Sequence, residues 1–157
     1  MNLELINPFI TSASNVITTM ATMEIKQGEA LQCTDLPPAD ITGILTMVSD
    51  RVEGVLAVSF TKPVIFELTK RLLGIEPTDI DEIVEDMVGD ITNMVYGSAK
   101  TILDEEGYNF DMVIPDVIQE ADIAIDFPRD SMIAAVTFET EAGEFHVLIS
   151  FEGGALQ

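Results

Sequence analysis

Basic residues are scarce in this chain of 157 residues, which has seven lysines and arginines against 28 aspartates and glutamates. The resulting formal net charge of −21 argues against nucleic-acid binding, because contacts to phosphate need clustered Lys and Arg side chains. The same charge disfavours adsorption to an anionic membrane surface. It favours solubility and attracts a partner that offers a positive group.

Cysteine and histidine are almost absent, with Cys33 and His146 as single examples. One cysteine excludes an intrachain disulfide, and one histidine in a strand-like run leaves no Ser-His-Asp arrangement to assemble. We interpret both as structural residues, Cys33 being a small packed side chain. The chain also has no glycine-rich phosphate loop and no zinc-ligand spacing. Residues 79–82 are acidic but lack the glycine and distal glutamate of a calcium loop, so helix capping explains them better than a metal site.

Long hydrophobic runs are absent too, and none approaches the roughly 20 residues that a membrane-spanning helix needs. The first five residues contain no basic region and no signal-peptide core. A hydrophobic content of 47% is too high for an acidic disordered tail. No linker divides the sequence. We therefore expect one soluble, cytoplasmic domain over residues 1–157 that does not associate with membranes.

Apolar spacing predicts three helices. The first is expected to be capped by Asn7, to begin at Pro8 and to end near Met23. The second is expected to begin at Thr61 or Pro63 and to end at Gly74.

The third predicted helix is the longest, from Thr78 or Asp79 to about Glu106. Asp79 and Glu82 have the spacing of a capping box, and Gly107 follows the helix. Its expected core positions are Ile80, Ile83, Val84, Met87, Val88, Ile91, Met94, Val95, Ile102 and Leu103.

Seven strand-like segments accompany these helices, and two pairs of them have the turn chemistry of hairpins. The order of helix, strands, two helices and strands predicts an α+β fold with a largely antiparallel sheet and helices packed on it. The apolar segments 41–48 and 132–138 would leave aggregation-prone edges unless they are paired or covered. The predicted strands are 24–33, broken at Gly28, then 41–49, 55–60, 111–118, 123–127, 132–140 and 144–151.

The polar face of the third helix is the most informative pattern. Asp86, Asp90, Asn93 and Gly97 follow the steps i, i+4, i+7 and i+11, which places them within about 60° of one another, opposite the apolar stripe. Gly89 lies beside them, and a glycine inside a helix costs roughly 1 kcal/mol relative to alanine. Bare backbone beside an exposed amide suggests that another surface approaches closely there. The alternative is a solvated acidic face with glycines chosen for packing.

An exposed asparagine beside carboxylates has a specific chemical use. Its amide both donates and accepts hydrogen bonds, so it can orient a water for in-line attack on a phosphoryl group. The neighbouring carboxylate repels phosphate, but it can pair with a lysine of a phosphorylated partner. That partner would have to supply both the metal and the phosphoryl group.

The chain resembles the CheC/CheX family of chemotaxis phosphatases, and CheX more closely. Residues 6–10, with Asn15-Val16 and Thr19-Met20, are similar to the opening of CheX, and residues 89–100 are similar to the family's active-site helix. The family pattern is Asp or Ser, three residues, Glu, two residues, Asn, then Pro about two dozen positions later. The matching residues are Asp86, Asn93 and Pro115, with Pro115 one position closer than usual and Asp90 at the glutamate position.

The resemblance implies a CheC-like fold, a homodimer and one active helix per subunit. It implies hydrolysis of the aspartyl-phosphate on a CheY-like receiver domain, with Asn93 positioning water and Asp90 pairing with a lysine of the regulator. Mg²⁺ would be bound by the phosphorylated partner and no cofactor by this chain. Two alternatives remain. Asp90 is one methylene shorter than glutamate, which favours a non-catalytic module that binds receiver domains. The other alternative is a structural interaction protein, as in a flagellar switch, whose polar helix face is only solvated surface.

Overall fold

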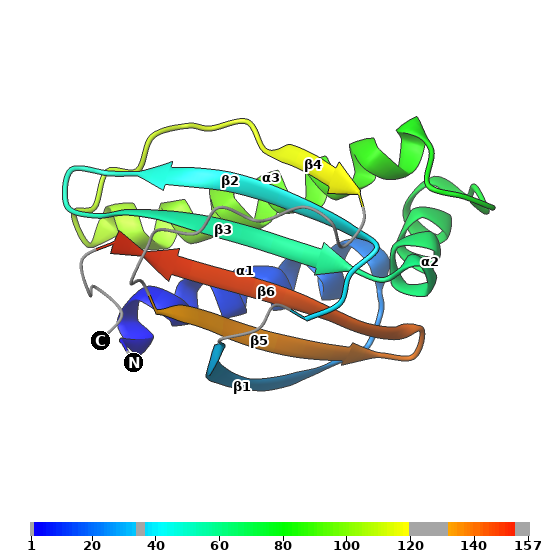
Figure 1. Ribbon diagram of the computed structural model, residues 1–157, viewed down its shortest axis with the longest axis horizontal. Coiled ribbons are helices and arrows are strands. Elements are labelled where there is room, and N and C mark those ends of the chain that lie inside the picture. The colour runs from blue at the N-terminus through cyan, green and yellow to red at the C-terminus, as the bar shows by residue number, and fades with distance from the viewer. Residues whose placement is uncertain (1, 34–36, 120–131, 153–157) are drawn as a thin grey trace.

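Six strands form one antiparallel sheet in the order β1-β5-β6-β3-β2-β4. The computed structural model of the chain describes residues 2–33, 37–119 and 132–152. The sheet confirms the predicted α+β class, and both predicted hairpins, β2–β3 and β5–β6, are present (Figure 1). The strands are β1 Ile25–Cys33, β2 Ile41–Val48, β3 Glu53–Phe60, β4 Asp116–Gln119, β5 Ile133–Thr140 and β6 Gly143–Phe151.

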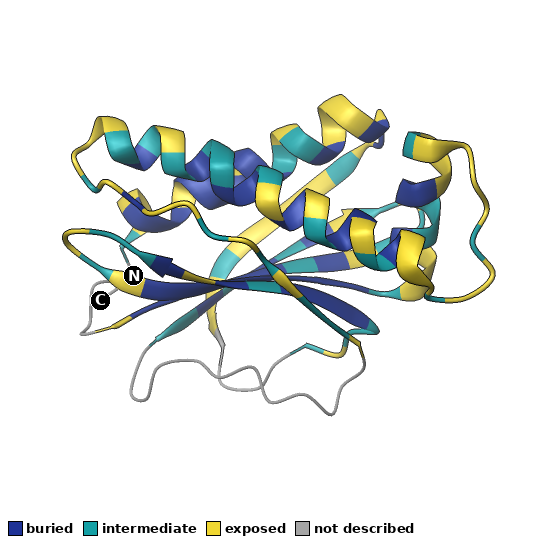
Figure 2. Ribbon diagram, turned by 90° about the horizontal axis from the view of Figure 1, so that it is seen from above, coloured by how far each residue is buried: buried dark blue, intermediate teal, exposed yellow. Residues whose placement is uncertain are grey.

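Three helices accompany the sheet: α1 Leu3–Ala21, α2 Lys62–Leu73 and α3 Glu82–Glu105. α1 and α3 lie side by side on one face of the sheet, and α2 lies at one end of it (Figures 1 and 2). Alternate residues of the strands face these helices, and the core between the two layers is fully buried. Three stacked rings, those of Phe60, Phe145 and Phe138, form part of it, with centroids 5.5 and 4.8 Å apart along the stack.

The first helix begins five residues earlier than the sequence predicts. Asn2, rather than Asn7, is the N-cap, and its Oδ1 accepts a hydrogen bond of 3.1 Å from the Glu4 N–H. Pro8 therefore lies inside α1, where it removes one backbone donor. Burial outweighs that loss, because Leu5 and Ile6 upstream of the proline are 2% and 0% exposed.

The third helix begins later than predicted. Asp81 is its N-cap and accepts from the Val84 N–H at 3.0 Å, whereas Asp79 accepts from Ile80 N–H, one residue along the chain. The acidic run does cap the helix, but the capping box of Asp79 and Glu82 was wrong. Ile83 was wrong as a core residue: it lies in the first turn and is 39% exposed.

The predicted strand 111–118 is reduced to β4. Residues 116–119 pair with 41–44 of β2, while Asp111 upstream donates its N–H to the Val48 carbonyl at 2.8 Å. Pro115 has no N–H to donate to a ladder, which explains why the strand begins after it. The predicted strand 123–127 and the Cys33 side chain lie outside the described residues. No helix in the described ranges is long and apolar enough to cross a membrane.

Candidate functional site

The outer face of α3 has the polar side chains that the sequence predicts there. Asp86, Asp90 and Asn93 are exposed (Figure 2 shows this helix by burial). The opposite face is buried, which confirms the predicted orientation of the helix. The buried residues on α3 are Val84, Met87, Val88, Ile91, Thr92, Val95, Tyr96, Ala99 and Leu103.

A glycine in the sheet sets how closely α3 approaches it. Gly43 on β2 lies under the buried Thr92, and a Cβ built on Gly43 would fall 1.9 Å from Thr92 Oγ1. The Thr92 hydroxyl donates to the Val88 carbonyl at 2.8 Å, so it is held inside its own helix. The turn of α3 that includes Asn93 therefore rests directly on the backbone of β2.

A groove of about 400 Å³ lies between the outer face of α3 and the chain that leads into β4. It joins the helix residues of the sequence motif to Pro115, which lies on a different segment. Gly97 is not part of it. The lining residues are Glu85, Asp86, Gly89, Asp90, Asn93, Ile114, Pro115 and Val117.

The wall opposite α3 is held by α3 itself. The Tyr96 hydroxyl donates to the Asp111 carbonyl at 2.5 Å, and Asp104 Oδ1 accepts from the Phe110 N–H at 2.8 Å. Burial raises the pKa of Tyr96 to about 12, so its hydroxyl remains a donor at neutral pH. Partial burial would raise the pKa of Asp104, but the hydrogen bond from Lys100, at 2.5 Å, and the Phe110 N–H together lower it.

The groove is anionic, and no cationic side chain of the described residues lines it. Asp86 and Asp90 form no ion pair with the described residues, and Glu85 accepts a hydrogen bond from the Gln119 amide. Lys100 on the same helix is paired with Asp104. The site therefore offers negative charge to a cationic side chain from outside.

Asn93 provides the neutral polar group of the groove. Its exposed amide has no hydrogen-bond partner within the part of the chain that the structure describes. The two N–H donors of its NH2 group and its carbonyl acceptor are thus available for a water or for an incoming group. No group of three or more His, Cys, Asp or Glu residues in the described ranges is arranged to hold a metal ion.

Packing within the described residues requires a glycine at neither of the two glycine positions of α3. Among the residues that the structure describes, a Cβ on Gly97 would meet nothing within 4 Å, and a Cβ on Gly89 would contact Val117 at 3.5 Å, an ordinary van der Waals distance. We expect Gly97→Ala and Gly89→Ala each to raise the free energy of unfolding, by about 0.5–1 kcal/mol, because alanine favours the helix. Urea unfolding measures this. A loss of stability in either variant would mean that packing within the chain requires that glycine.

Sequence reasoning missed three lining residues, Glu85, Ile114 and Val117. Glu85 precedes Asp86 on the helix, but it lies in the first turn, and the predicted start of the helix was wrong. Ile114 and Val117 belong to the segment expected to be a strand, where apolar residues predict burial. Ile114 is instead 89% exposed.

His146 has the structural role that the sequence predicts. It is half-buried on β6, and its Nδ1 lies 3.0 Å from the Thr137 hydroxyl on the neighbouring strand. Burial lowers the pKa of His146, so the neutral ring is favoured at neutral pH. It is not among the residues that line the groove.

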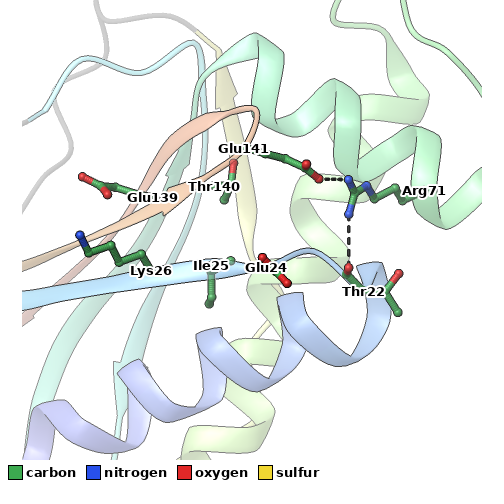
Figure 3. Close-up of a pocket in the computed structure, with 8 residues that line it drawn as sticks. All are labelled: Thr22, Glu24, Ile25, Lys26, Arg71, Glu139, Thr140 and Glu141. Carbon is green, nitrogen blue, oxygen red and sulfur yellow. Dashed lines mark hydrogen bonds and ion pairs between the residues drawn. The ribbon is translucent and has the colours of Figure 1, made fainter.

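A second hollow, of about 700 Å³, lies at the edge of the sheet opposite β4, where β1 begins and β5 ends (Figure 3). Its main cation, Arg71, already donates to Glu67 at 2.9 Å, to Glu141 and to the Thr22 carbonyl at 3.3 Å. These bonds join α2 to the end of α1 and to the β5–β6 turn. The hollow contains none of the predicted site residues, and its Arg71 and Glu141 are paired with each other.

Comparison with protein families matches residues 41–139, which include the whole groove, to chemotaxis phosphatase CheX. A CheC-like superfamily protein from Shewanella sp. PV-4 is 39% identical, with a TM-score of 0.90 over 98% of this chain and 100% of that one. Chemotaxis protein CheX from Vibrio vulnificus is 35% identical, with a TM-score of 0.88 over 95% and 99%.

A more distant structure is the CheX–CheY–BeF3–Mg²⁺ complex from Borrelia burgdorferi. Its matching chain is 22% identical, with a TM-score of 0.82 over 95% of this chain and 98% of that one. At this identity the likeness shows the fold alone. A comparison with curated proteins gave no significant match.

Proposed function

Because the chain belongs to the CheX family of chemotaxis phosphatases, we propose that it hydrolyses the aspartyl-phosphate of a CheY-like receiver domain. The observation that supports this is the groove, which brings Asp90, Asn93 and Pro115 together from separate segments. These are the positions of the family pattern. The Borrelia burgdorferi complex supplies the class of partner, since it contains a CheX with CheY.

In the proposed reaction, the Asn93 amide enters the active site of the receiver and orients a water. The water oxygen attacks phosphorus in line, the bond from phosphorus to the aspartyl oxygen breaks, and the products are inorganic phosphate and a free carboxylate. Mg²⁺ on the receiver neutralises charge on the transferring phosphoryl group. This chain supplies the water-positioning amide and binds no cofactor of its own.

The carboxylates of the groove serve recognition. Asp90 pairs with a lysine of the receiver, which fixes Asn93 relative to the phosphoryl group. Asp86, one turn earlier on the same face, supports the helix or the interface. Gly89 and Gly97 leave the helix backbone open to a close approach by a partner, and a Cβ at either position would clash with none of the described residues.

The direct test is the release of inorganic phosphate from a phosphorylated receiver domain, with and without this protein. The proposal predicts faster release in its presence, at catalytic ratios of protein to receiver. Release at the intrinsic rate with several receivers, combined with tight binding, would favour the non-catalytic module. Asp90 in place of glutamate is the feature that supports that second candidate.

Substitutions at Asp90 separate charge from reach. Asp90→Asn keeps the size and removes the charge, so we expect the KM for the phosphorylated receiver to rise about tenfold and its salt dependence to weaken. Asp90→Glu keeps the charge and has the reach usual in the family, so it should maintain or raise the rate. Steady-state phosphate release at two salt concentrations measures both. A wild-type KM in Asp90→Asn would remove Asp90 from the partner contact.

The proposal includes a homodimer in the cytoplasm, as the family resemblance implies. The two apolar strands that would leave exposed edges if they were unpaired are paired on both sides within the sheet: β2 lies between β3 and β4, and β5 lies between β1 and β6. The outer strands are β1 and β4, so pairing across subunits would have to use one of these. Light scattering gives the mass, and a concentration-independent monomer would contradict the dimer.

A further inference from the structure

Two large apolar side chains beside the groove are unusually exposed. Ile114 is 89% exposed and Met112 is 78% exposed. The next most exposed large hydrophobic residue in the described ranges is Leu31, at 61%. Single exposed apolar residues are ordinary, but two neighbours that are almost fully solvated next to a candidate site suggest an interaction surface.

The backbone fixes the direction of these side chains. They are two residues apart in a segment without helical structure, whereas Val113 between them is half-buried and packs against the core. The segment is held upstream at Asp111, which bonds to Tyr96 and to the Val48 carbonyl, and downstream by β4. Met112 and Ile114 therefore remain exposed, on the segment that joins α3 to β4 and runs beside β2 in Figure 1.

The apolar pair continues the groove. Ile114 lines the same hollow as Asp90 and Asn93. Met112 precedes Ile114 by two residues with the half-buried Val113 between them, an alternation that turns the two exposed side chains the same way. We propose that Met112 and Ile114 form an apolar contact with the receiver domain, directly beside the cationic side chain that Asp90 binds. This inference rests on the proposed function and adds the surface chemistry of the partner: a basic side chain flanked by exposed aliphatic groups.

Charge favours the receiver over other occupants. Glu85, Asp86 and Asp90 lie in the same groove as Ile114, so whatever covers Ile114 must bring positive charge to them. A second copy of this chain has a net charge of −21 and would bring mainly like charge. An anionic vesicle is repelled for the same reason.

The contact should govern affinity more than chemistry. Neither side chain has a polar group that can position water. Their contact should therefore stabilise the bound ground state and the transition state by the same free energy, and its loss weakens both equally. Such a loss raises KM and leaves kcat nearly unchanged. This pattern differs from the loss of turnover expected for Asn93, and it separates an apolar anchor from a catalytic residue.

The test measures binding and turnover for Ile114→Ser, Met112→Ser and the double variant. The matched control is Leu31→Ser, an exposed leucine on β1 at the opposite edge of the sheet. Binding to a receiver domain loaded with BeF3⁻ and Mg²⁺ is measured by titration calorimetry, and each variant's mass by sedimentation. We expect the Kd to rise about tenfold in Ile114→Ser and further in the double variant, with an unchanged melting temperature.

Each result has a defined meaning. A Kd that stays within twofold of wild type in the double variant, or that rises equally in Leu31→Ser, overturns the contact. A change of mass with an unchanged Kd would instead assign the pair to a second copy. If wild type binds the receiver without hydrolysis and the double variant loses that binding, the contact stands while the phosphatase proposal fails. If wild type binds no receiver, both fail.

Discussion

Asn93→Ala is expected to lower the turnover of a phosphorylated receiver on the order of 10²–10³-fold, the usual cost of losing a group that positions or polarises the reacting atoms. The ionic contact of Asp90 would remain, so KM should change little. Steady-state phosphate release over a range of receiver concentrations separates kcat from KM. The fold should be unaffected, with a change in unfolding free energy below about 0.5 kcal/mol, since the side chain is exposed and has no partner within the described residues.

Asn15→Ala is the matched control. Asn15 is also an exposed asparagine on a long helix of the same layer, α1, but the positions three and seven residues before it are Ser12 and Pro8 rather than carboxylates. It should retain the wild-type rate. Equal losses in both variants would point to a general effect of removing a polar helix residue, and a wild-type rate in Asn93→Ala would place the site elsewhere.

Gly43→Ala is expected to cost about 3 kcal/mol of unfolding free energy, at the upper end of what overpacking usually costs. The new methyl group would lie 1.9 Å from Thr92 Oγ1 and 2.9 Å from Thr92 Cβ, and Thr92 is fully buried. The strand and the helix would have to separate. For a domain of this size the melting temperature should fall by roughly 6–12 °C, as calorimetry or circular dichroism can measure.

A second substitution tests the cause. Thr92→Ala removes the hydroxyl and the γ-methyl group, so the double variant Gly43→Ala, Thr92→Ala should recover part of the lost stability. Recovery should be partial, because the contact to Thr92 Cβ remains at 2.9 Å. Purely additive losses would show that the two residues do not interact. Asn93 follows Thr92 directly, so a shift of α3 in Gly43→Ala also moves Asn93. This variant should therefore release phosphate more slowly than wild type, even under conditions where it is folded.

The sequence predicts those parts of the fold that follow from local periodicity and turn chemistry. Both hairpins and the orientation of α3 fall in this class, because burial repeats every two residues in a strand and every three to four in a helix. The helix starts do not. Asn2 and Asn7 are both acceptable caps, as are Asp79 and Asp81, and only the burial of Leu5 and Ile6 and the course of the chain before Glu82 distinguish them.

The candidate site likewise has one wall that the sequence predicts and one that it does not. Asp86, Asp90 and Asn93 could be placed on one face from their spacing along a helix. The second wall could not, because its position depends on tertiary bonds from Tyr96 and Asp104 to a segment without regular structure. Pro115 entered through the family pattern, and Ile114 was overlooked since an apolar residue in a strand-like segment predicts burial rather than exposure.

The support of one wall of the groove by the helix that forms the other wall has an evolutionary consequence. Both walls lie in residues 82–119, and the contacts that position them outside that stretch include Gly43 and Val48 on β2. The site and these supports therefore lie in one continuous block, 41–119, and are inherited together. Recombination with breakpoints outside this block would exchange α1 and the β5–β6 hairpin. Because α1 packs against α3 and β6 pairs with β3, such an exchange keeps the groove only where the buried faces of the new elements fit the old ones.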